Sequence, residues 1–224
     1  MTKKHLISSI ALTAAVGALV GIAVITVSWP GRMADTRPAS AGTVYLTFDD
    51  GPGEDTGAIL DLLAKHYAKA TFFMQGVNVG GREETVERIL DEGHKVGNHT
   101  WSHPDLTGLS DAEKRHEFER TDEALKKAGA SPKCSRPPYG ATDDDVKDVQ
   151  EELGLRQTLW SVDTGDALGA DEGKIVRLVE SAEDRDVVLT HDGGGDRSAT
   201  LHALERALPK LADKGLRFES LPYC

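Results

Sequence analysis

The chain from position 43 onward alternates between two patterns of hydrophobic and polar residues. Val44, Leu46 and Phe48 occupy every second position, which is the period of a β-strand with one buried face. The apolar group that follows, from Ile59 to Leu63, has the spacing of a buried helix face. By the same patterns, further strands are predicted near residues 70–74, 94–98, 158–162, 187–189 and 216–221, and further helices near residues 86–90, 110–129, 142–154, 175–179 and 201–211. This alternation predicts a single α/β domain without internal repeats.

Three of the predicted helices carry boundary signals. Ser110 followed by Glu113 predicts a capping box at the start of a polar helix. Gly93 can end the helix near residues 86–90, because glycine readily adopts the left-handed conformation that closes many helices. Pro209 lies inside the last apolar stripe, where its missing N–H predicts a kink.

The first 41 residues differ in composition from the rest of the chain. Lys3 and Lys4 precede residues 6–31, which carry no charge. A basic start followed by an apolar run predicts an export signal, and this run is also long enough to cross a bilayer as an anchor. We expect residues 1–29 to be a signal peptide or membrane anchor and residues 30–41 to be a linker. Residues 42–224 are then extracellular, or anchored on the outer face of the cytoplasmic membrane.

Net charge argues against one class of partner. The first 41 positions contain four basic residues and one acidic residue, which leaves 22 basic and 36 acidic residues in the remainder. A domain this acidic lacks the basic patches that phosphate backbones require, so nucleic acid is not an expected partner. We expect a monomer whose substrate is neutral or cationic.

Unusual polar residues follow the predicted strands. Asp49 and Asp50 come after the first strand, His99 after the third, Asp166 after the strand near 158–162, and His191 after the strand near 187–189. In barrels and open α/β sheets, active sites are built at the rim formed by the C-terminal ends of the strands. The sequence therefore predicts one site at this rim.

The pair Asp49-Asp50 places two carboxylates side by side at a strand end. Because adjacent strand residues point to opposite faces, the two acids are expected to have different roles. A plain turn is the alternative, since Gly51-Pro52 follows directly and such pairs are common in turns.

His99 and His103 have the spacing of metal ligands. On one helical turn, imidazoles four residues apart face the same way, and Pro104 favours a short turn over a long helix. Two histidines plus a carboxylate from another strand end, with positions left for water, are typical of a catalytic metal site. Position 100 is Thr rather than Glu, so the metalloprotease pattern His-Glu-x-x-His is absent.

Two further segments offer chemistry of their own. In the stiff segment Arg136-Pro137-Pro138-Tyr139, the arginine can orient a carboxylate through two hydrogen bonds, and the backbone can present an N–H to an oxyanion. His191, beside a glycine-rich loop, can donate a proton to a leaving group near neutral pH. The alternatives are a plain loop for the first segment and a buried structural histidine for the second.

The chain has two cysteines, Cys134 and Cys224. Outside the cytoplasm a disulfide between them is allowed, and it would tie the last residue to the segment just before Arg136. The alternative is two unpaired thiols, one of them on the last residue of an exported protein. The disulfide is the favoured interpretation.

Five ordered motifs resemble those of the polysaccharide deacetylases, carbohydrate esterase family 4, which share the NodB homology domain. They are Thr47-Phe48-Asp49-Asp50-Gly51-Pro52, His99-Thr100-Trp101-Ser102-His103, Arg136-Pro137-Pro138-Tyr139, Asp163-Thr164-Gly165-Asp166 and Leu189-Thr190-His191-Asp192. The resemblance covers residues 43–221. It implies a distorted, incomplete (β/α) barrel that hydrolyses acetyl groups on a polysaccharide substrate.

The resemblance also implies a metal centre and a catalytic base. Asp50, His99 and His103 would bind a divalent metal, most often zinc. Asp49 would be the general base, and Arg136 would fix its position.

For the remaining groups the resemblance implies roles around the scissile bond. His191 would be the general acid, supported by Asp166. The backbone N–H of Tyr139 would help to form an oxyanion hole, and Leu189 would line the acetyl pocket. A catalytic pair that needs an ionised Asp49 and a protonated His191 predicts a bell-shaped pH–rate profile.

One position departs from the family pattern. The family usually has Trp after the second Asp of the fourth motif, whereas this chain has Ala167, which leaves the preferred glycan open among chitin-like polymers, peptidoglycan and xylan. The main alternative enzyme is an acetylxylan esterase that uses the same site on an O-acetyl ester. A non-catalytic wall-glycan binding domain is the alternative from another class.

Overall fold

The computed structural model describes residues 41–224. The predicted leader, residues 1–29, and nearly all of the predicted linker lie outside the described residues. Within the described part, no helix is long and apolar enough to cross a membrane.

In the part of the chain that the structure describes, eight strands form one parallel sheet. They are β1 (Gly42–Asp49), β2 (Ala70–Met74), β3 (Lys95–Asn98), β4 (Cys134–Ser135), β5 (Arg156–Gln157), β6 (Val162–Asp163), β7 (Val187–His191) and β8 (Leu216–Phe218). Their order is β5-β4-β3-β2-β1-β7-β6, and β8 pairs with the first residues of β1. Every pairing is parallel. The sheet curls without closing, which is the incomplete (β/α) barrel that the motifs implied.

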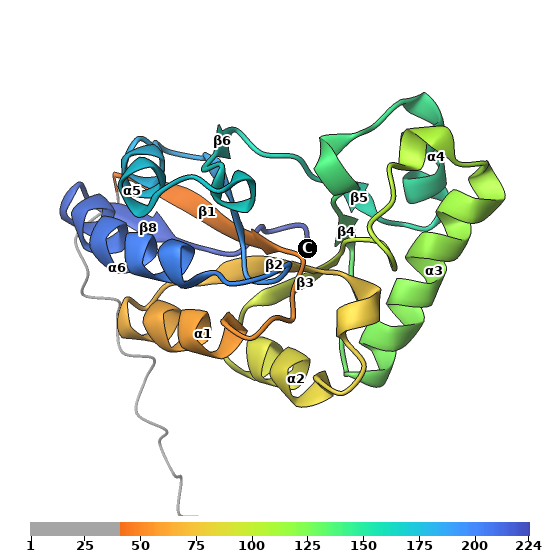
Figure 1. Ribbon diagram of the computed structural model, residues 1–224, viewed down its shortest axis with the longest axis horizontal. Coiled ribbons are helices and arrows are strands. Elements are labelled where there is room, and N and C mark those ends of the chain that lie inside the picture. Colours follow the sequence, from red (N-terminus) through yellow and green to blue (C-terminus); the bar gives the residue numbers. More distant parts are fainter. Residues whose placement is uncertain (1–40) are drawn as a thin grey trace, which may run out of the picture. The chain divides into compact units, whose positions relative to one another are not determined.

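Six α-helices connect these strands. They are α1 (Thr56–Lys65), α2 (Glu83–Asp91), α3 (Asp111–Lys127), α4 (Asp144–Glu152), α5 (Glu172–Glu180) and α6 (Ser198–Asp213). Short 3-10 turns follow several strands, namely η1 (Gly76–Asn78), η2 (Leu106–Gly108), η3 (Pro138–Gly140) and η4 (Asp166–Leu168). Figure 1 shows α6, α1 and α2 along one side of the sheet, and α3 with α4 beside the short strands β4 and β5.

The central strands β1 and β2 supply much of the buried core. All five residues of β2 are buried, as expected for the middle of a parallel sheet. Phe48 of β1 stacks on Phe72 of β2 with ring centroids 4.9 Å apart. A second cluster lies between α3 and α4, formed by Leu106, Phe118, Val146, Val149 and Leu155.

The strand predicted over residues 158–162 is wrong, because the structure has two short strands at either end of that segment. The N–H of Thr158 donates to the carbonyl of Ser135 in β4, whereas the N–H of Ser161 donates to the carbonyl of Val187 in β7. The segment thus crosses from one end of the sheet to the other and changes its hydrogen-bonding partner. Hydrophobic spacing cannot show a change of partner, and the strand β4 was not predicted because two residues are too few to show a period.

The predicted helix boundaries agree with the structure. Ser110 and Glu113 form a capping box at the start of α3, and Gly93 follows α2 with a φ of 80°. Helix α6 continues through Pro209 to Asp213. Pro209 lies on the exposed side of this helix.

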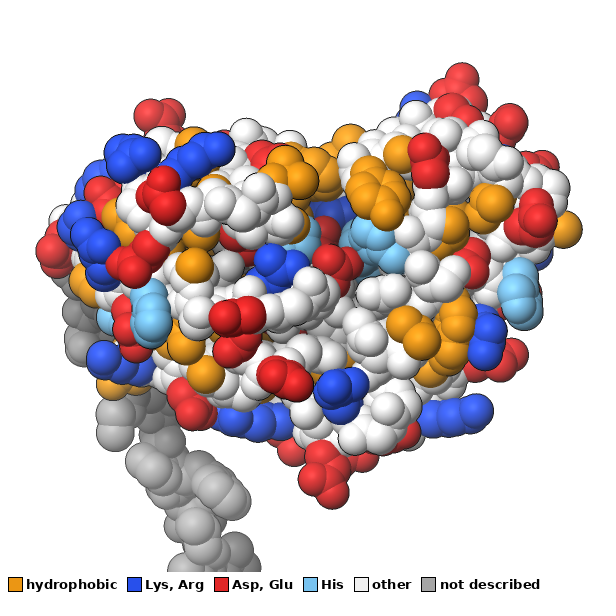
Figure 2. Space-filling view, in the orientation of Figure 1, with side chains coloured by type: hydrophobic (Ala, Val, Ile, Leu, Met, Phe, Trp, Pro, Cys, Tyr) orange, Lys and Arg blue, Asp and Glu red, His pale blue; other side chains and the backbone are white. Residues whose placement is uncertain are grey.

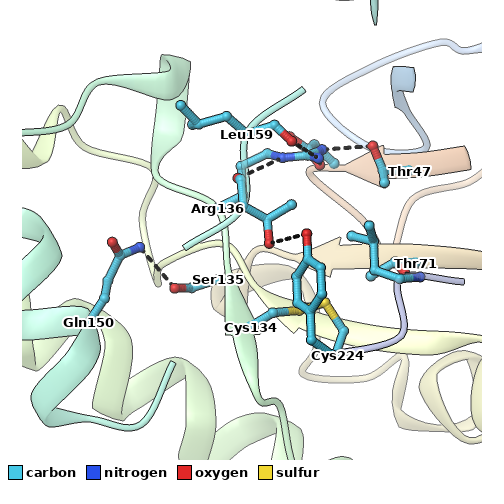
Figure 3. Close-up of a disulfide and its surroundings, with 12 residues drawn as sticks. Thr47, Thr71, Cys134, Ser135, Arg136, Gln150, Leu159 and Cys224 are labelled. Atoms are coloured by element: carbon cyan, nitrogen blue, oxygen red, sulfur yellow. Dashed lines mark hydrogen bonds and ion pairs between the residues drawn. A yellow bond between two sulfur atoms is a disulfide. The ribbon is translucent and has the colours of Figure 1, made fainter. Parts of the chain in front are cut away.

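Cys134 and Cys224 form a disulfide, with Cα atoms 4.9 Å apart and a sequence separation of 90. Cys134 is buried with Phe73 and Leu221, and Cys224 packs against this cluster. Figure 3 shows the bridge close to Arg136, joining the last residue of the chain to β4. The bridge therefore fixes the C-terminus against the inner part of the sheet.

We expect reduction of this disulfide to lower the melting temperature. A bridge that closes a loop of this length restricts the unfolded chain and contributes about 2–5 kcal/mol to the free energy of unfolding. Calorimetry with and without reductant measures the shift. A variant with Cys134→Ser and Cys224→Ser should melt at the lower temperature whether or not reductant is present. Equal melting temperatures for the oxidised and reduced protein would contradict the expectation.

Candidate active site

The candidate catalytic residues meet at one rim of the sheet. Asp49 and His191 are the last residues of β1 and β7 and are paired in register. His99 and Arg136 directly follow β3 and β4. In Figure 2, histidine and acidic side chains gather in a hollow near the middle of the visible face. The sequence prediction that these strand ends converge is confirmed.

Three side chains form a cluster suited to a metal ion. Single donor atoms of Asp50, His99 and His103 all lie within 4.8 Å of one another. The Oδ1 atom of Asp50 is 3.4 Å from Nε2 of His99 and 3.3 Å from Nε2 of His103. Ligands of a tetrahedral zinc ion lie about 3.3 Å apart when the zinc–ligand distances are about 2.0–2.1 Å. The two distances from Asp50 therefore match those between neighbouring ligands of a zinc ion.

The chemistry of the donor atoms also fits a divalent metal. The Nδ1 atom of His99 is 2.7 Å from the carbonyl of Arg136, so this nitrogen carries the hydrogen and Nε2 keeps a lone pair directed at Asp50. Oδ1 of Asp50 is buried and has no hydrogen-bond partner. Burial raises the pKa of Asp50, but the neighbouring His99, together with His103 and His191, lowers it to about 2. Burial, together with the charge of His99, lowers the pKa of His103, which favours the neutral imidazole that a metal ligand must be.

The two histidines do not lie on a helical turn, contrary to the prediction from their spacing. Residues 99–104 form an irregular loop in which Thr100 and His103 have φ values of 64° and 63°. This left-handed conformation is rare for residues with a side chain, and it is most costly for β-branched ones. The helical spacing therefore predicted that these two histidines lie together, as they do, but for a wrong geometric reason.

Asp49 and Asp50 have different surroundings, as expected for adjacent residues at a strand end. Oδ1 of Asp49 accepts a hydrogen bond of 2.7 Å from Nη1 of Arg136, and the same Nη1 donates to Oγ1 of Thr47. Nε and Nη2 of Arg136 donate to the carbonyls of Thr158 and Leu159, as Figure 3 shows for several of these contacts. Burial lowers the pKa of Arg136, and the charge of Asp49 opposes that shift. The fully buried arginine therefore fixes one carboxylate oxygen and leaves the other free.

Tyr139 has a backbone suited to presenting its N–H. Its φ is 61° within the turn η3, and its side chain is 70% exposed. The ring lies 4.6 Å from the ring of His103, measured between centroids. This contact brings the Arg136–Tyr139 segment next to the metal-ligand cluster, where an oxyanion hole would be needed.

His191 forms a pair with Asp166. Nδ1 of His191 donates to Oδ1 of Asp166 over 2.7 Å, and the backbone N–H of His191 and Oγ1 of Thr200 both donate to Oδ2. Burial lowers the pKa of His191, but Asp166 and the other nearby carboxylates more than offset this, so its pKa is raised. Asp166 therefore holds the ring in one orientation and keeps Nε2 available to give up a proton.

Leu189 and Ala167 have contrasting environments. Leu189 is 5% exposed on β7, two residues before His191 on the same strand. Ala167 and Leu168 lie in η4, and Leu168 is 88% exposed. The wall of the site next to Asp166 is therefore formed by small or aliphatic side chains where the family usually has Trp.

Two buried residues, Arg197 and Asp192, join the loops of the site, and no role was predicted for either of them. Arg197 donates through Nε to the carbonyl of Gly193 and through Nη2 to that of Gly194. The carboxylate of Asp192 accepts a hydrogen bond of 2.6 Å from Thr56, and burial raises its pKa to about 7. Asp192 is the last residue of the fifth motif, directly after the candidate acid, whereas Arg197 belongs to no motif.

Comparison with known proteins shows which family this chain belongs to. The sequence profile described as polysaccharide deacetylase matches residues 36–158, more than half of the chain. The chain belongs to the polysaccharide deacetylase family. The profile match ends before Asp166 and His191, but a curated relative, the peptidoglycan-N-acetylglucosamine deacetylase of Bacillus cereus, is 40% identical over 189 residues. That alignment covers 83% of this chain and 69% of the relative.

Two further relatives support membership of this deacetylase family. The chitooligosaccharide deacetylase of Sinorhizobium fredii is 36% identical over 196 residues, which is 81% of this chain and 91% of that protein. A solved structure of a family 4 carbohydrate esterase from Streptomyces lividans, in complex with acetate, has a TM-score of 0.76 and 37% identity. It covers 80% of this chain and 93% of that chain.

Proposed function

We propose that this deacetylase hydrolyses N-acetyl groups on chitooligosaccharide or peptidoglycan outside the cytoplasm, in a metal-dependent reaction. One observation carries the proposal. The ligand-like cluster of Asp50, His99 and His103 lies at the same strand-end rim as two pre-formed hydrogen-bonded pairs, Arg136–Asp49 and Asp166–His191.

Asp50, His99 and His103 would hold the divalent cation, and zinc suits a site with two imidazoles and one carboxylate. When bound, such a cation makes water more acidic and polarises a carbonyl oxygen at neutral pH. The carboxylate of Asp50 then has one role, which is to bind the metal. That assignment leaves Asp49 to move a proton.

Asp49 is placed to act as the general base. Arg136 occupies its Oδ1, and its Oδ2 lies 3.8 Å from Nε2 of His99, so the free oxygen faces the metal cluster. In the proposed reaction Oδ2 accepts a proton from the water that adds to the acetyl carbon. The N–H of Tyr139 donates to the oxyanion that develops on the acetyl oxygen.

His191 completes the reaction by supplying a proton to the departing nitrogen. An amide nitrogen is a poor leaving group until it is protonated, and the raised pKa of His191 keeps the imidazolium populated near neutral pH. The C–N bond then breaks to give acetate and a free amine. The Bacillus relative is a peptidoglycan-N-acetylglucosamine deacetylase and the Sinorhizobium relative a chitooligosaccharide deacetylase, which supports an N-acetylated glycan over an ester as the substrate.

A polymer substrate needs space beside the metal cluster. A cavity of about 540 Å³ is lined by residues that follow β1, β2 and β7, including Gly53, Gln75, Asn78 and Gly194. The side chain of Asn78 donates to the backbone carbonyl of Asp50 over 2.8 Å, so this cavity adjoins the cluster. It offers amide and carboxylate groups of the kind that bind sugar hydroxyls.

Replacing Asp166 with Asn should shift the alkaline limb of the pH–rate profile to lower pH. The charge of Asp166 raises the pKa of His191, and the general acid works only below that pKa. Without the charge, His191 loses its proton at a lower pH, and activity falls there too. Profiles of kcat for the wild type and the variant measure the shift. An alkaline limb that stays in place would exclude His191 as the acid that Asp166 supports.

The location outside the cytoplasm is part of the proposal. It is supported by the uncharged run over residues 6–31 after Lys3 and Lys4. The Cys134–Cys224 disulfide adds a second argument, because disulfides are rare in reducing compartments.

A substrate panel tests the proposal. The purified protein is incubated with chitooligosaccharide, peptidoglycan and acetylated xylan, and both acetate and free amine are measured. Equal amounts of acetate and amine from either N-acetylated glycan are the expected result. Acetate from xylan alone would indicate an O-acetyl esterase, and no product from any of the three would favour a glycan-binding role.

A further inference from the structure

The loop between the two histidine ligands is held by contacts that no metal-site motif describes. Its carbonyls at Thr100 and Trp101 accept hydrogen bonds from the N–H groups of Gly76 and Val77. Oγ1 of Thr100 accepts from the N–H of His103 over 3.2 Å. These contacts hold one side of the loop, but they leave the N–H groups of residues 101 and 102 to be satisfied elsewhere.

One carboxylate on α3 accepts from both of these N–H groups. Oε2 of Glu117 accepts hydrogen bonds from the N–H of Trp101 at 2.9 Å and of Ser102 at 2.7 Å. Oε1 of the same side chain accepts from Oγ of Ser102 at 2.9 Å. A single half-buried side chain thus makes three hydrogen bonds to the middle of the loop, and two of them are to consecutive backbone N–H groups.

A second residue on the same face of α3 fixes the indole of Trp101. Arg120, one turn after Glu117, places its guanidinium 3.8 Å from the centre of the Trp101 ring. On the β2 side, the indole lies so close to the backbone of Gly76 that a Cβ there would be 2.6 Å from it. Helix α3 therefore holds the backbone of the loop through Glu117, and it holds the indole of Trp101 through Arg120.

We propose that Glu117 is a positioning residue that holds the His99–His103 loop in the geometry required for metal binding. The loop needs such a clamp because Thr100 and His103 both adopt the left-handed conformation, with φ values of 64° and 63°. Residues with side chains keep this conformation only where the surroundings enforce it. Without the clamp, the loop relaxes and the Nε2 atom of His103 moves away from Asp50. This inference rests on the proposed metal site.

Two variants of Glu117 separate a positioning role from a general effect on folding. Glu117→Ala removes all three hydrogen bonds. Glu117→Gln keeps the shape, because its carbonyl oxygen can accept from both N–H groups and its NH2 can donate to Ser102. Glu119→Ala, which removes an exposed carboxylate from the same helix, is the matched control for charge. Zinc affinity of the full-length protein is measured by competition with a chromophoric chelator, and amide hydrogen exchange at Trp101 and Ser102 is measured without metal.

We expect Glu117→Ala to lower zinc affinity about 10- to 100-fold, the range found when a partner that orients a ligand is removed. Amide exchange at Trp101 and Ser102 should accelerate in the same variant, whereas Glu117→Gln and Glu119→Ala should behave as the wild type. Wild-type zinc affinity in Glu117→Ala would overturn the inference, even if that variant melted at a lower temperature. Failure of the wild type to bind zinc would refute the proposed function instead, and the exchange rates would still decide whether Glu117 holds the loop.

Discussion

Replacing Asp49 with Asn is expected to lower kcat by about 10²–10⁴-fold, the usual contribution of a general base, while zinc affinity stays close to that of the wild type. The asparagine oxygen can still accept the hydrogen bond that Arg136 now donates to Oδ1 of Asp49. The side chain therefore keeps its position, but it can no longer accept a proton from water. Acetate release and a zinc titration of the same preparation measure the two effects.

The substitution is also expected to destabilise the protein, and this effect must be distinguished from the loss of catalysis. Arg136 is fully buried and Asp49 is its only carboxylate partner within salt-bridge distance among the described residues. Removing the partner of a buried charge destabilises a protein by about 3–5 kcal/mol. Acetate release and zinc binding should therefore be measured well below the melting temperature of the variant. Loss of zinc from the folded variant would show that Asp49 rather than Asp50 is the ligand, which contradicts the assignment.

The second large effect is expected at the metal ligands. Replacing His103 with Ala removes one of three donor groups, so zinc affinity should fall by more than the roughly 10–100-fold that follows the loss of an orienting partner. Activity should fall in parallel and recover in part when zinc is added in excess. His116→Ala, which removes an exposed imidazole from α3, is the matched control. Zinc affinity that is unchanged in the His103 variant would remove this residue from the ligand set.

The fold could be predicted from the sequence where its elements have strong periodicity. The central strands β1, β2 and β7 and the apolar helices α1 and α6 were all expected near their observed positions. The short strands at the ends of the sheet were not, because residues 158–161 change hydrogen-bonding partner between β4 and β7. A two-residue strand such as Cys134–Ser135 has too few positions to show a period.

Candidate site residues could be predicted because strand ends in a parallel sheet meet at one rim. The backbone geometry of the site could not. Asp50, Thr100, His103 and Tyr139 are four of the six residues other than glycine that have positive φ among the described residues. Glycine is the usual sequence signal for a positive φ. When another residue adopts this conformation, the sequence does not show it. Such strain is concentrated at functional sites.

Two residues that support the loops of the site could not be predicted from sequence patterns either. Glu117 lies on a polar helix where its neighbours are charged as well, so nothing in its spacing distinguishes it. Arg197 acts through backbone carbonyls of Gly193 and Gly194, and backbone acceptors have no sequence signature. Residue type and order therefore predicted the candidate catalytic groups and two of the residues that position them, Arg136 and Asp166, whereas Glu117 and Arg197 required the structure.

The central claim is that the protein releases acetate with the help of a metal held by Asp50, His99 and His103. The most direct test measures acetate from an N-acetylated glycan with the purified protein as isolated, after removal of metal by a chelator, and after addition of zinc. We expect acetate release by the protein as isolated, no release after the metal is removed, and renewed release after zinc is added. Undiminished acetate release by the metal-free protein, or no release with zinc demonstrably bound, would contradict it.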